Sequence, residues 1–166
     1  MHALTEAAIR RSMVNCSRSE AAALTPPRDL HELDWASLEV LGWRDPKAEL
    51  RGWLVHEQDD AVVGLALRAA DTRMSSRRSA MCLLCQTVRP AAEISLFTAR
   101  RVGEAGRNGN TVGTYICADL GCARRVSEVP PSAQAFDEEF QQLVVAEQTE
   151  GLRRRLGAFT ADVLRR

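Results

Sequence analysis

The sequence contains almost no lysine, few aromatic residues and no long apolar run. Lys47 is the only lysine among 22 basic residues, and aromatic side chains make up 5% of the chain. No segment approaches the roughly 18 consecutive apolar residues needed to cross a bilayer, which argues against a membrane protein. The N-terminal residues are charged and contain no apolar signal-peptide core, so we expect a cytoplasmic protein.

Motifs of the common enzyme classes are also missing from the sequence. It has no Gly-Lys-Ser phosphate loop, no nucleophile elbow and no His-x-Glu before its cysteines. The histidines (His2, His31 and His56) have no metal-ligand spacing with one another or with acids. Asp119 and Glu93 are better interpreted as surface or loop-capping residues. We therefore predict that the protein is not an enzyme.

Four cysteines form the most informative motif of the chain. Cys82 and Cys85 are a C-x2-C pair, and Cys117 and Cys122 follow as a C-x4-C pair after 31 intervening residues. Two close pairs of thiolates fit a tetrahedral zinc ion, and four protein ligands leave no open catalytic position. The first spacing predicts a tight knuckle, and the second predicts a strand end leading into a helix. We therefore predict a treble-clef finger with one structural Zn²⁺.

Two disulfides, or a redox-active C-x2-C, are the alternatives to zinc. A cytoplasmic location argues against disulfides, and redox chemistry at the first pair leaves Cys117 and Cys122 unexplained. The fifth cysteine, Cys16, lies far from the others in the sequence. We expect it to be a small, partly buried residue without a partner.

The net charge is zero, but its distribution is uneven. Residues 1–67 have a net charge of −4 and residues 126–166 a net charge of −2, whereas residues 68–125 contain ten arginines and four acids. One zinc ion and four thiolates together add −2, so the loaded finger remains basic. An anionic partner is one interpretation. A general preference for arginine over lysine is the other.

Hydrophobic periodicity and turn residues predict an α+β fold in three parts. Residues 1–79 form a small N-terminal helical region with a β-hairpin, residues 80–128 form the zinc finger, and residues 129–166 form a C-terminal amphipathic helix. Helices are expected over residues 3–14 and 19–24, with a short helix over 120–126. Strands are expected over 52–57, 61–68, 93–101 and 111–116. Residues 30–41 are expected to form a helix or a loop with one helical turn, ended by Gly42, and residues 103–110 a mobile hairpin tip.

The last helix is expected to start after an N-cap at Ser132, with a break or kink at Gly151. An ordinary helix packed on the domain and a dimerising or partner-binding helix both fit its apolar period. Trp35, Trp43 and Trp53 are expected to be core anchors, and a ring platform for a ligand is the alternative. The oligomeric state is not predicted.

The finger resembles the elongation factor G-binding protein family of the fusidic-acid-resistance type, which carries a C-terminal treble-clef zinc finger. Cys82-Leu-Leu-Cys85 and the segment Gly109–Cys122 carry the resemblance, and residues 14–17 and 42–46 extend it. The resemblance implies a protein that binds elongation factor G, largely through the finger, and promotes release of the factor from a stalled ribosome. It also implies that the four cysteines are the zinc ligands.

The residues of the finger also suggest a contact surface for such a partner. We expect an apolar centre of Leu83, Leu84 and Phe97 inside a basic rim, which is typical of a moderate protein interface. The rim consists of Arg100, Arg101, Arg107, Arg124 and Arg125. A nucleic-acid-binding or ribosomal-RNA-binding module is the main alternative. A finger that only supports a site in the N-terminal half is a third hypothesis.

Overall fold

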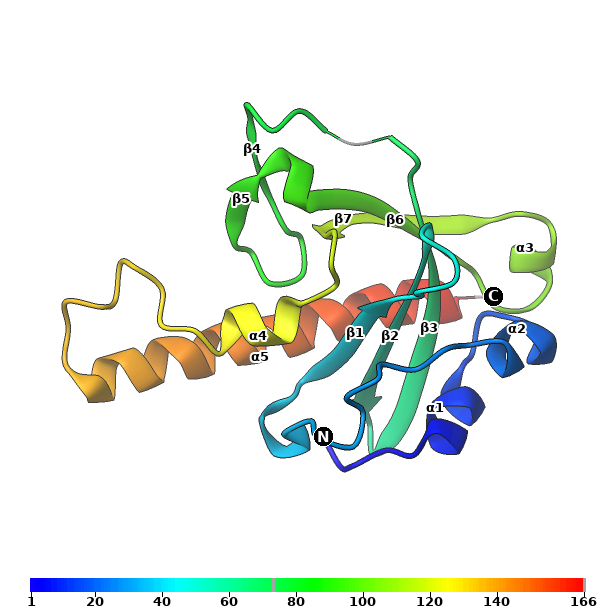
Figure 1. The fold of residues 1–166 in the computed structure, drawn as a ribbon, viewed down its shortest axis with the longest axis horizontal. Helices are drawn as coiled ribbons and strands as arrows, with labels where there is room; N and C mark the ends of the chain where they lie inside the picture. The colour runs from blue at the N-terminus through cyan, green and yellow to red at the C-terminus, as the bar shows by residue number, and fades with distance from the viewer. Residues whose placement is uncertain (73, 166) are drawn as a thin grey trace.

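The computed structural model describes residues 1–72 and 74–165, and one antiparallel sheet forms its centre (Figure 1). The strand order is β1-β2-β3-β6-β7. The strands of this sheet are β1 (Val40–Arg44), β2 (Arg51–Gln58), β3 (Ala61–Ala69), β6 (Ile94–Arg100) and β7 (Thr111–Cys117). A second, two-stranded sheet pairs β4 (Ser79–Met81) with β5 (Val88–Pro90). The predicted α+β class is confirmed.

Two long hairpins build most of the sheet, as the alternating apolar residues predicted. Asp59 and Asp60 join β2 to β3 with φ angles of 51° and 60°, a left-handed turn that suits the twist of paired strands. Strands β6 and β7 pair along their whole length. The tip between them differs from the prediction, because Gly103–Arg107 form a short helix, α3.

Strand β1 replaces the helix or loop that the sequence predicted to end at Gly42. The structure has one 3-10 turn, η1 (Trp35–Ser37), within residues 30–39, and from Val40 the chain pairs with β2. Val40, Leu41 and Trp43 are all buried, so residues on both faces of β1 are covered. A strand buried on both faces has no apolar-polar alternation, and its sequence pattern therefore did not reveal it.

The sheet is continuous across the predicted boundary between residues 79 and 80. β3 and β6 pair directly, although over only two positions, Arg68 with Thr98 and Ala69 with Phe97. Beyond them the strands separate, and the amide of Asn15 bridges the gap. It donates to the carbonyls of Ala66 and Arg100, and its oxygen accepts from the Ala66 N–H at 2.7 Å. The three-part division of the chain stays a proposal.

The N-terminal helices cover one face of the sheet. They are α1 (Glu6–Ser12) and α2 (Arg18–Ala22), close to the predicted helices. Ser17 and Glu20 form a complete capping box at the start of α2. Ile9 of α1 packs with Trp43 and Trp53 in one hydrophobic cluster, which Trp35 joins as a partly buried residue. Trp43 and Trp53 are core residues, as predicted, whereas Trp35 packs at the edge of the cluster.

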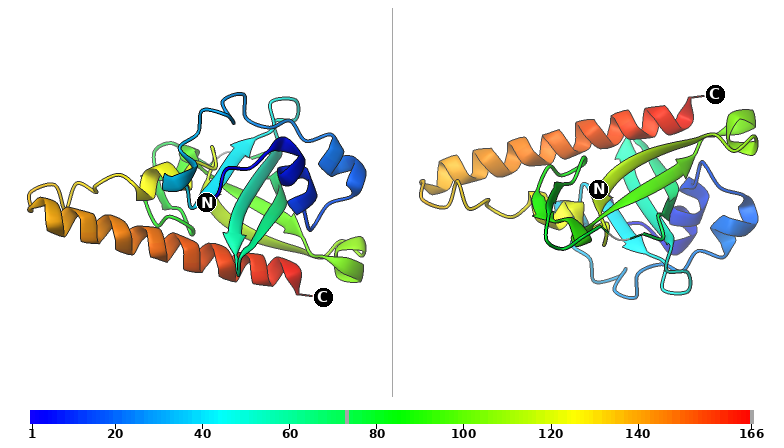
Figure 2. Two further views of the ribbon diagram at one scale, coloured as in Figure 1. Left: turned by 90° about the horizontal axis from the view of Figure 1, so that it is seen from below. Right: turned by 90° about the horizontal axis from the view of Figure 1, so that it is seen from above.

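The C-terminal helix and the finger cover the opposite face, so the sheet lies between two layers (Figure 2). Helix α5 (Glu138–Leu164) is unbroken at Gly151, which corrects the predicted kink. It also starts later than predicted, because Asp137 rather than Ser132 caps it. Four apolar residues of its C-terminal half are buried, namely Leu152, Leu156, Phe159 and Val163.

The N-terminal half of α5 extends beyond the sheet (Figure 1). Its apolar side chains remain largely exposed, at 40% for Phe140 and 65% for Leu143. Within residues 1–72 and 74–165, no helix combines the length and apolar character needed to span a bilayer.

Candidate metal centre

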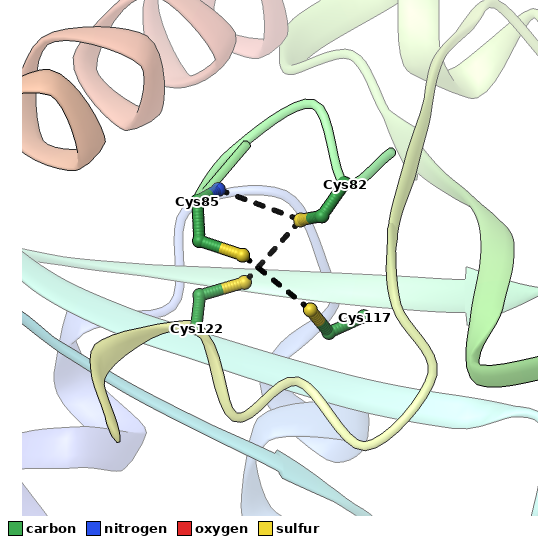
Figure 3. Close-up of side chains that lie close together, drawn as sticks. All are labelled: Cys82, Cys85, Cys117 and Cys122. Carbon is green, nitrogen blue, oxygen red and sulfur yellow. Dashed lines mark hydrogen bonds between the residues drawn. The ribbon is translucent and has the colours of Figure 1, made fainter. Parts of the chain in front are cut away.

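The fold brings the four predicted zinc ligands together from four separate positions (Figure 3). Cys82 and Cys85 lie in the knuckle that joins β4 to β5. Cys117 is the last residue of β7, and Cys122 is the first residue of helix α4 (Cys122–Val126). A knuckle, a strand end and a helix start are the arrangement of a treble clef, so this prediction is confirmed.

The distances between the sulfurs match tetrahedral metal coordination. Four ligands at a Zn–S distance of about 2.3 Å lie about 3.8 Å from one another. The Sγ atoms of Cys82 and Cys122 are 3.7 Å apart, and those of Cys85 and Cys117 are 3.6 Å apart. A disulfide requires about 2.05 Å, and all of these cysteines are free. The site therefore fits one structural zinc ion and excludes the predicted alternative of two disulfides.

The backbone of the knuckle directs both of its sulfurs inward. Gln86 has a left-handed φ of 59°, and its N–H donates to the Cys82 carbonyl at 2.9 Å. The Cys85 N–H points at the Cys82 sulfur at 3.4 Å, and the Thr87 hydroxyl lies 3.0 Å from the Cys85 sulfur. Such contacts stabilise thiolates and fix the orientation of metal ligands.

The proximity of the four thiols strongly perturbs their titration. The pKa of Cys85 is lowered by its contacts with Cys117 and Cys122, and the pKa of Cys82 falls to about 7. The pKa of Cys122 is raised, chiefly by its contacts with Cys117 and Cys82 and also by burial. The cluster therefore cannot easily hold four negative charges by itself. A divalent cation removes this conflict, because it holds every thiolate in its charged form.

An ion pair between the buried Arg125 and the half-exposed Asp119 braces the loop between the last two ligands. The Asp119 carboxylate accepts from both terminal nitrogens of Arg125 at 3.0 and 2.9 Å, and from the Gly121 N–H at 3.0 Å. Burial alone raises the pKa of Asp119, but the bonds from Arg125 and Gly121 outweigh it, so the pKa is lowered. The interpretation of Asp119 as a loop-capping residue agrees with this geometry.

Two further contacts connect the site to the rest of the fold. Arg155 of α5 donates to the Leu84 carbonyl of the knuckle at 2.6 Å. Leu120, between the last two ligands, lies so close to β1 that a Cβ on Gly42 would be 2.4 Å from its carbonyl oxygen. Neither contact was predicted, since no local motif marks residues that meet over such sequence distances.

The predicted apolar centre of the partner surface needs correction. Phe97 is fully buried in the core and Leu84 is 2% exposed, so neither can contact a partner. Leu83, in contrast, is 48% exposed. The side chains of Phe97 and Ala99 on β6 both face the core, so the prediction of Phe97 as a partner-contact residue was wrong.

Three other apolar side chains lie exposed around the knuckle with Leu83. Met81 and Val88 are directly opposite each other on β4 and β5 and are 45% and 67% exposed. Tyr115 is 45% exposed, and its carbonyl accepts from the Leu83 N–H at 2.8 Å. We call Met81, Leu83, Val88 and Tyr115 the knuckle patch. Its signal in the sequence was the pair of apolar residues, Met81 and Leu83, on either side of the ligand Cys82.

Several arginines of the predicted basic rim have partners within the protein. Arg100 forms an ion pair with Glu20, and Arg101 donates to the backbone carbonyl of Asp162. Arg124 also reaches Asp119. Arg125 is 9% exposed and bound to Asp119, so it braces the finger and is not a rim residue. Arg107 lies exposed on α3, away from the zinc ligands.

Cys16 is partly buried and lies outside the metal cluster, as predicted. Burial raises the pKa of its thiol to about 11, and the Glu20 carboxylate adds to this shift. A thiol with so high a pKa is largely protonated at neutral pH and is a poor metal ligand.

Comparisons with known proteins agree with this geometry. The model of the FBP C-terminal treble-clef zinc-finger family matches residues 8–163. No curated protein sequence matches the chain. The fold is similar to the structure of the fusidic acid resistance protein FusC, with a TM-score of 0.50 and 18% sequence identity. This similarity covers 83% of the chain and 50% of FusC, so the chain spans about half the length of that protein.

Proposed function

Because this chain belongs to the FBP C-terminal treble-clef zinc-finger family, we propose that it is a cytoplasmic, non-enzymatic protein that binds elongation factor G. The zinc ion acts as a structural element in this proposal. It joins the knuckle, β7 and α4 into one rigid unit, and zinc ligation contributes roughly 10–16 kcal/mol in isolated zinc-finger peptides.

The knuckle patch is the observation that carries this proposal. Four apolar side chains lie exposed on the element that zinc holds most firmly. Clustered exposed apolar residues mark binding surfaces in soluble proteins, and a tyrosine or methionine among them is typical of protein interfaces. Leu83 projects from between the first two ligands, so loss of zinc would also remove the shape of this surface.

Release of elongation factor G from the ribosome, and resistance to fusidic acid, are further parts of the proposal. The likeness of the fold to FusC supports them. The chain spans about half of FusC, so both activities are proposals for this chain.

The alternative of a nucleic-acid-binding or ribosomal-RNA-binding module has weaker support. Such binding relies on basic side chains that are free to neutralise phosphates. Arg100, Arg124 and Arg125 instead have acidic partners within the protein. This alternative predicts an affinity that falls steeply with salt, whereas an apolar contact predicts a small salt dependence.

Titration calorimetry with elongation factor G from the same organism, at two salt concentrations, tests the proposal. The zinc-loaded protein is expected to bind at both concentrations, and chelator-treated protein is expected not to bind. Absence of binding by the zinc-loaded protein would refute the function. Binding only at low salt, with equal affinity for an RNA oligonucleotide, would favour the alternative.

A further inference from the structure

The sheet face under the N-terminal helices is only partly covered, and its uncovered part forms a hollow of about 550 Å³. This volume lies within the range of small-molecule sites, roughly 300–1,000 Å³. Neighbouring strands supply the lining, with Arg51 and Trp53 from β2, Arg68 from β3 and Arg100 from β6. None of the four zinc ligands and no residue of the knuckle patch lines it.

Two arginines face each other directly in this hollow. Arg51 of β2 and Arg68 of β3 are cross-strand partners in the antiparallel register. Within residues 1–72 and 74–165, neither guanidinium forms an ion pair with an acidic group. Like charges directly opposite each other destabilise a sheet. A bound anion between them would turn this repulsion into two attractive contacts.

The side chain of Arg51 is already positioned for such a contact. Its guanidinium carbon lies 5.8 Å from the centre of the Trp53 ring, which is a cation–π distance. Trp53 is itself fixed, because it is 1% exposed and its indole N–H donates to Asp45 at 3.2 Å. An arginine that stacks on a ring through its face keeps its N–H edges available for a planar or tetrahedral anion.

Neither of the two acidic residues that line the hollow forms an ion pair with Arg51 or Arg68. Glu20 is paired with Arg100 on the far side of the hollow, so this pair is neutral. Glu49 is exposed to solvent on the loop before β2. The remaining lining is small or apolar, including Leu50, Ala66 and Thr98.

We propose that this hollow binds a small organic phosphate, such as a mononucleotide, with the phosphate between Arg51 and Arg68. Arginine binds phosphate through paired N–H donors, which explains why two arginines stand at this position. The apolar lining accommodates the organic part of the ligand. This site is separate from the finger surface, so it is independent of binding to elongation factor G.

Titration calorimetry of the full chain with adenosine 5′-monophosphate, pyrophosphate and adenosine tests the proposal. The two phosphates are expected to bind, and adenosine is expected to bind at least about tenfold more weakly, because it lacks the charged group. Arg51→Gln and Arg68→Gln should each raise the Kd for the phosphates about tenfold. Arg107→Gln, which changes an exposed arginine outside the hollow, should leave the Kd unchanged, and Glu49→Gln should not raise it.

Thermal melting separates lost binding from lost folding. Arg68→Gln removes a repulsion, so its Tm should not fall below that of the wild type. If a variant does not fold, NMR of the ¹⁵N-labelled wild-type protein tests the site instead. The side-chain N–H signals of Arg51 and Arg68 should both shift when adenosine 5′-monophosphate is added. No binding of either phosphate, or equal loss in Arg107→Gln, would overturn the proposal.

Discussion

His56 on β2 and Thr160 on α5 form a buried hydrogen bond, with 2.8 Å between Nε2 and Oγ1. Both residues are almost inaccessible to solvent, at 2% and 0% exposed. The other ring nitrogen, Nδ1, lies 3.3 Å from the backbone carbonyl of Glu57. A neutral imidazole satisfies this environment, and it links strand β2 to the C-terminal helix across the main core.

This buried histidine predicts a pH-dependent stability. Burial lowers the pKa of His56, although the contact with the Glu57 carbonyl acts in the opposite direction. Below about pH 6.5 the unfolded chain binds a proton that the folded chain resists, so the free energy of unfolding decreases as the pH falls, by at most about 1.4 kcal/mol per pH unit. The decrease ends below the lowered pKa of the folded state. Urea unfolding between pH 7.5 and 5 measures it.

His56→Gln provides the comparison, because glutamine can bond Thr160 and does not titrate. Its free energy of unfolding should change less with pH than that of the wild type over this window. His31→Gln is the control, since His31 is exposed and its loss should leave the pH dependence unchanged. An equal pH dependence in wild type and His56→Gln would contradict the role of His56.

Zinc content depends on each of the four ligands. Cys117→Ser should lose the ion and unfold the finger, because three thiolates cannot complete the shell and β7 and α4 then separate. Native mass spectrometry should show no zinc in this variant. Cys16→Ser is the matched control and should retain one zinc ion, as it lies outside the cluster. Loss of zinc from both variants, or from neither, would show that the site is wrongly assigned.

Asp119→Asn should destabilise the finger by about 2 kcal/mol, since it leaves the buried guanidinium of Arg125 without its charged partner. Asp119 itself is half exposed, which keeps the effect below that of a fully buried pair. Thermal melting of the zinc-loaded protein measures it. Glu93→Gln breaks the more exposed ion pair with Arg89 and should cost at most about 1 kcal/mol. The reverse order of these two effects would refute a structural role for Asp119.

Gly42→Ala should destabilise the protein by about 1–3 kcal/mol, because the new Cβ meets backbone rather than a movable side chain. That backbone is the carbonyl of Leu120, between two zinc ligands, so zinc should also dissociate faster in competition with a chelator. Gly113→Ala on β7 is the control. Its Cβ would have no neighbour closer than the Leu96 side chain, at 3.4 Å, which is an ordinary van der Waals contact. Zinc release at the wild-type rate in Gly42→Ala would show that β1 does not support the site.

The metal site could be predicted from the sequence because its chemistry is local to two short motifs. The C-x2-C and C-x4-C spacings determine a knuckle and a helix start, and both are present. The β2–β3 hairpin was predictable for a similar reason, since Asp59 and Asp60 tolerate a left-handed turn between two alternating runs.

The elements that were mispredicted depend on contacts between distant parts of the chain. β1 is covered on both faces, so it lacks the alternation that identifies a strand. In β6, Phe97 was predicted to contact a partner but faces the core, because neighbouring residues of a strand point to opposite faces of the sheet. The role of Arg125 depends on its hydrogen-bonded ion pair with Asp119, which the number of charged residues in the sequence does not reveal.

The contact between the knuckle patch and elongation factor G is the central claim, and titration of two leucine variants tests it most directly. Leu83 and Leu143 are both exposed, at 48% and 65%, but only Leu83 lies in the zinc knuckle. Leu83→Ala should raise the Kd for elongation factor G about tenfold with zinc content unchanged, and Leu143→Ala should leave it at the wild-type value. Wild-type affinity in Leu83→Ala, or a larger loss in Leu143→Ala, would contradict this account.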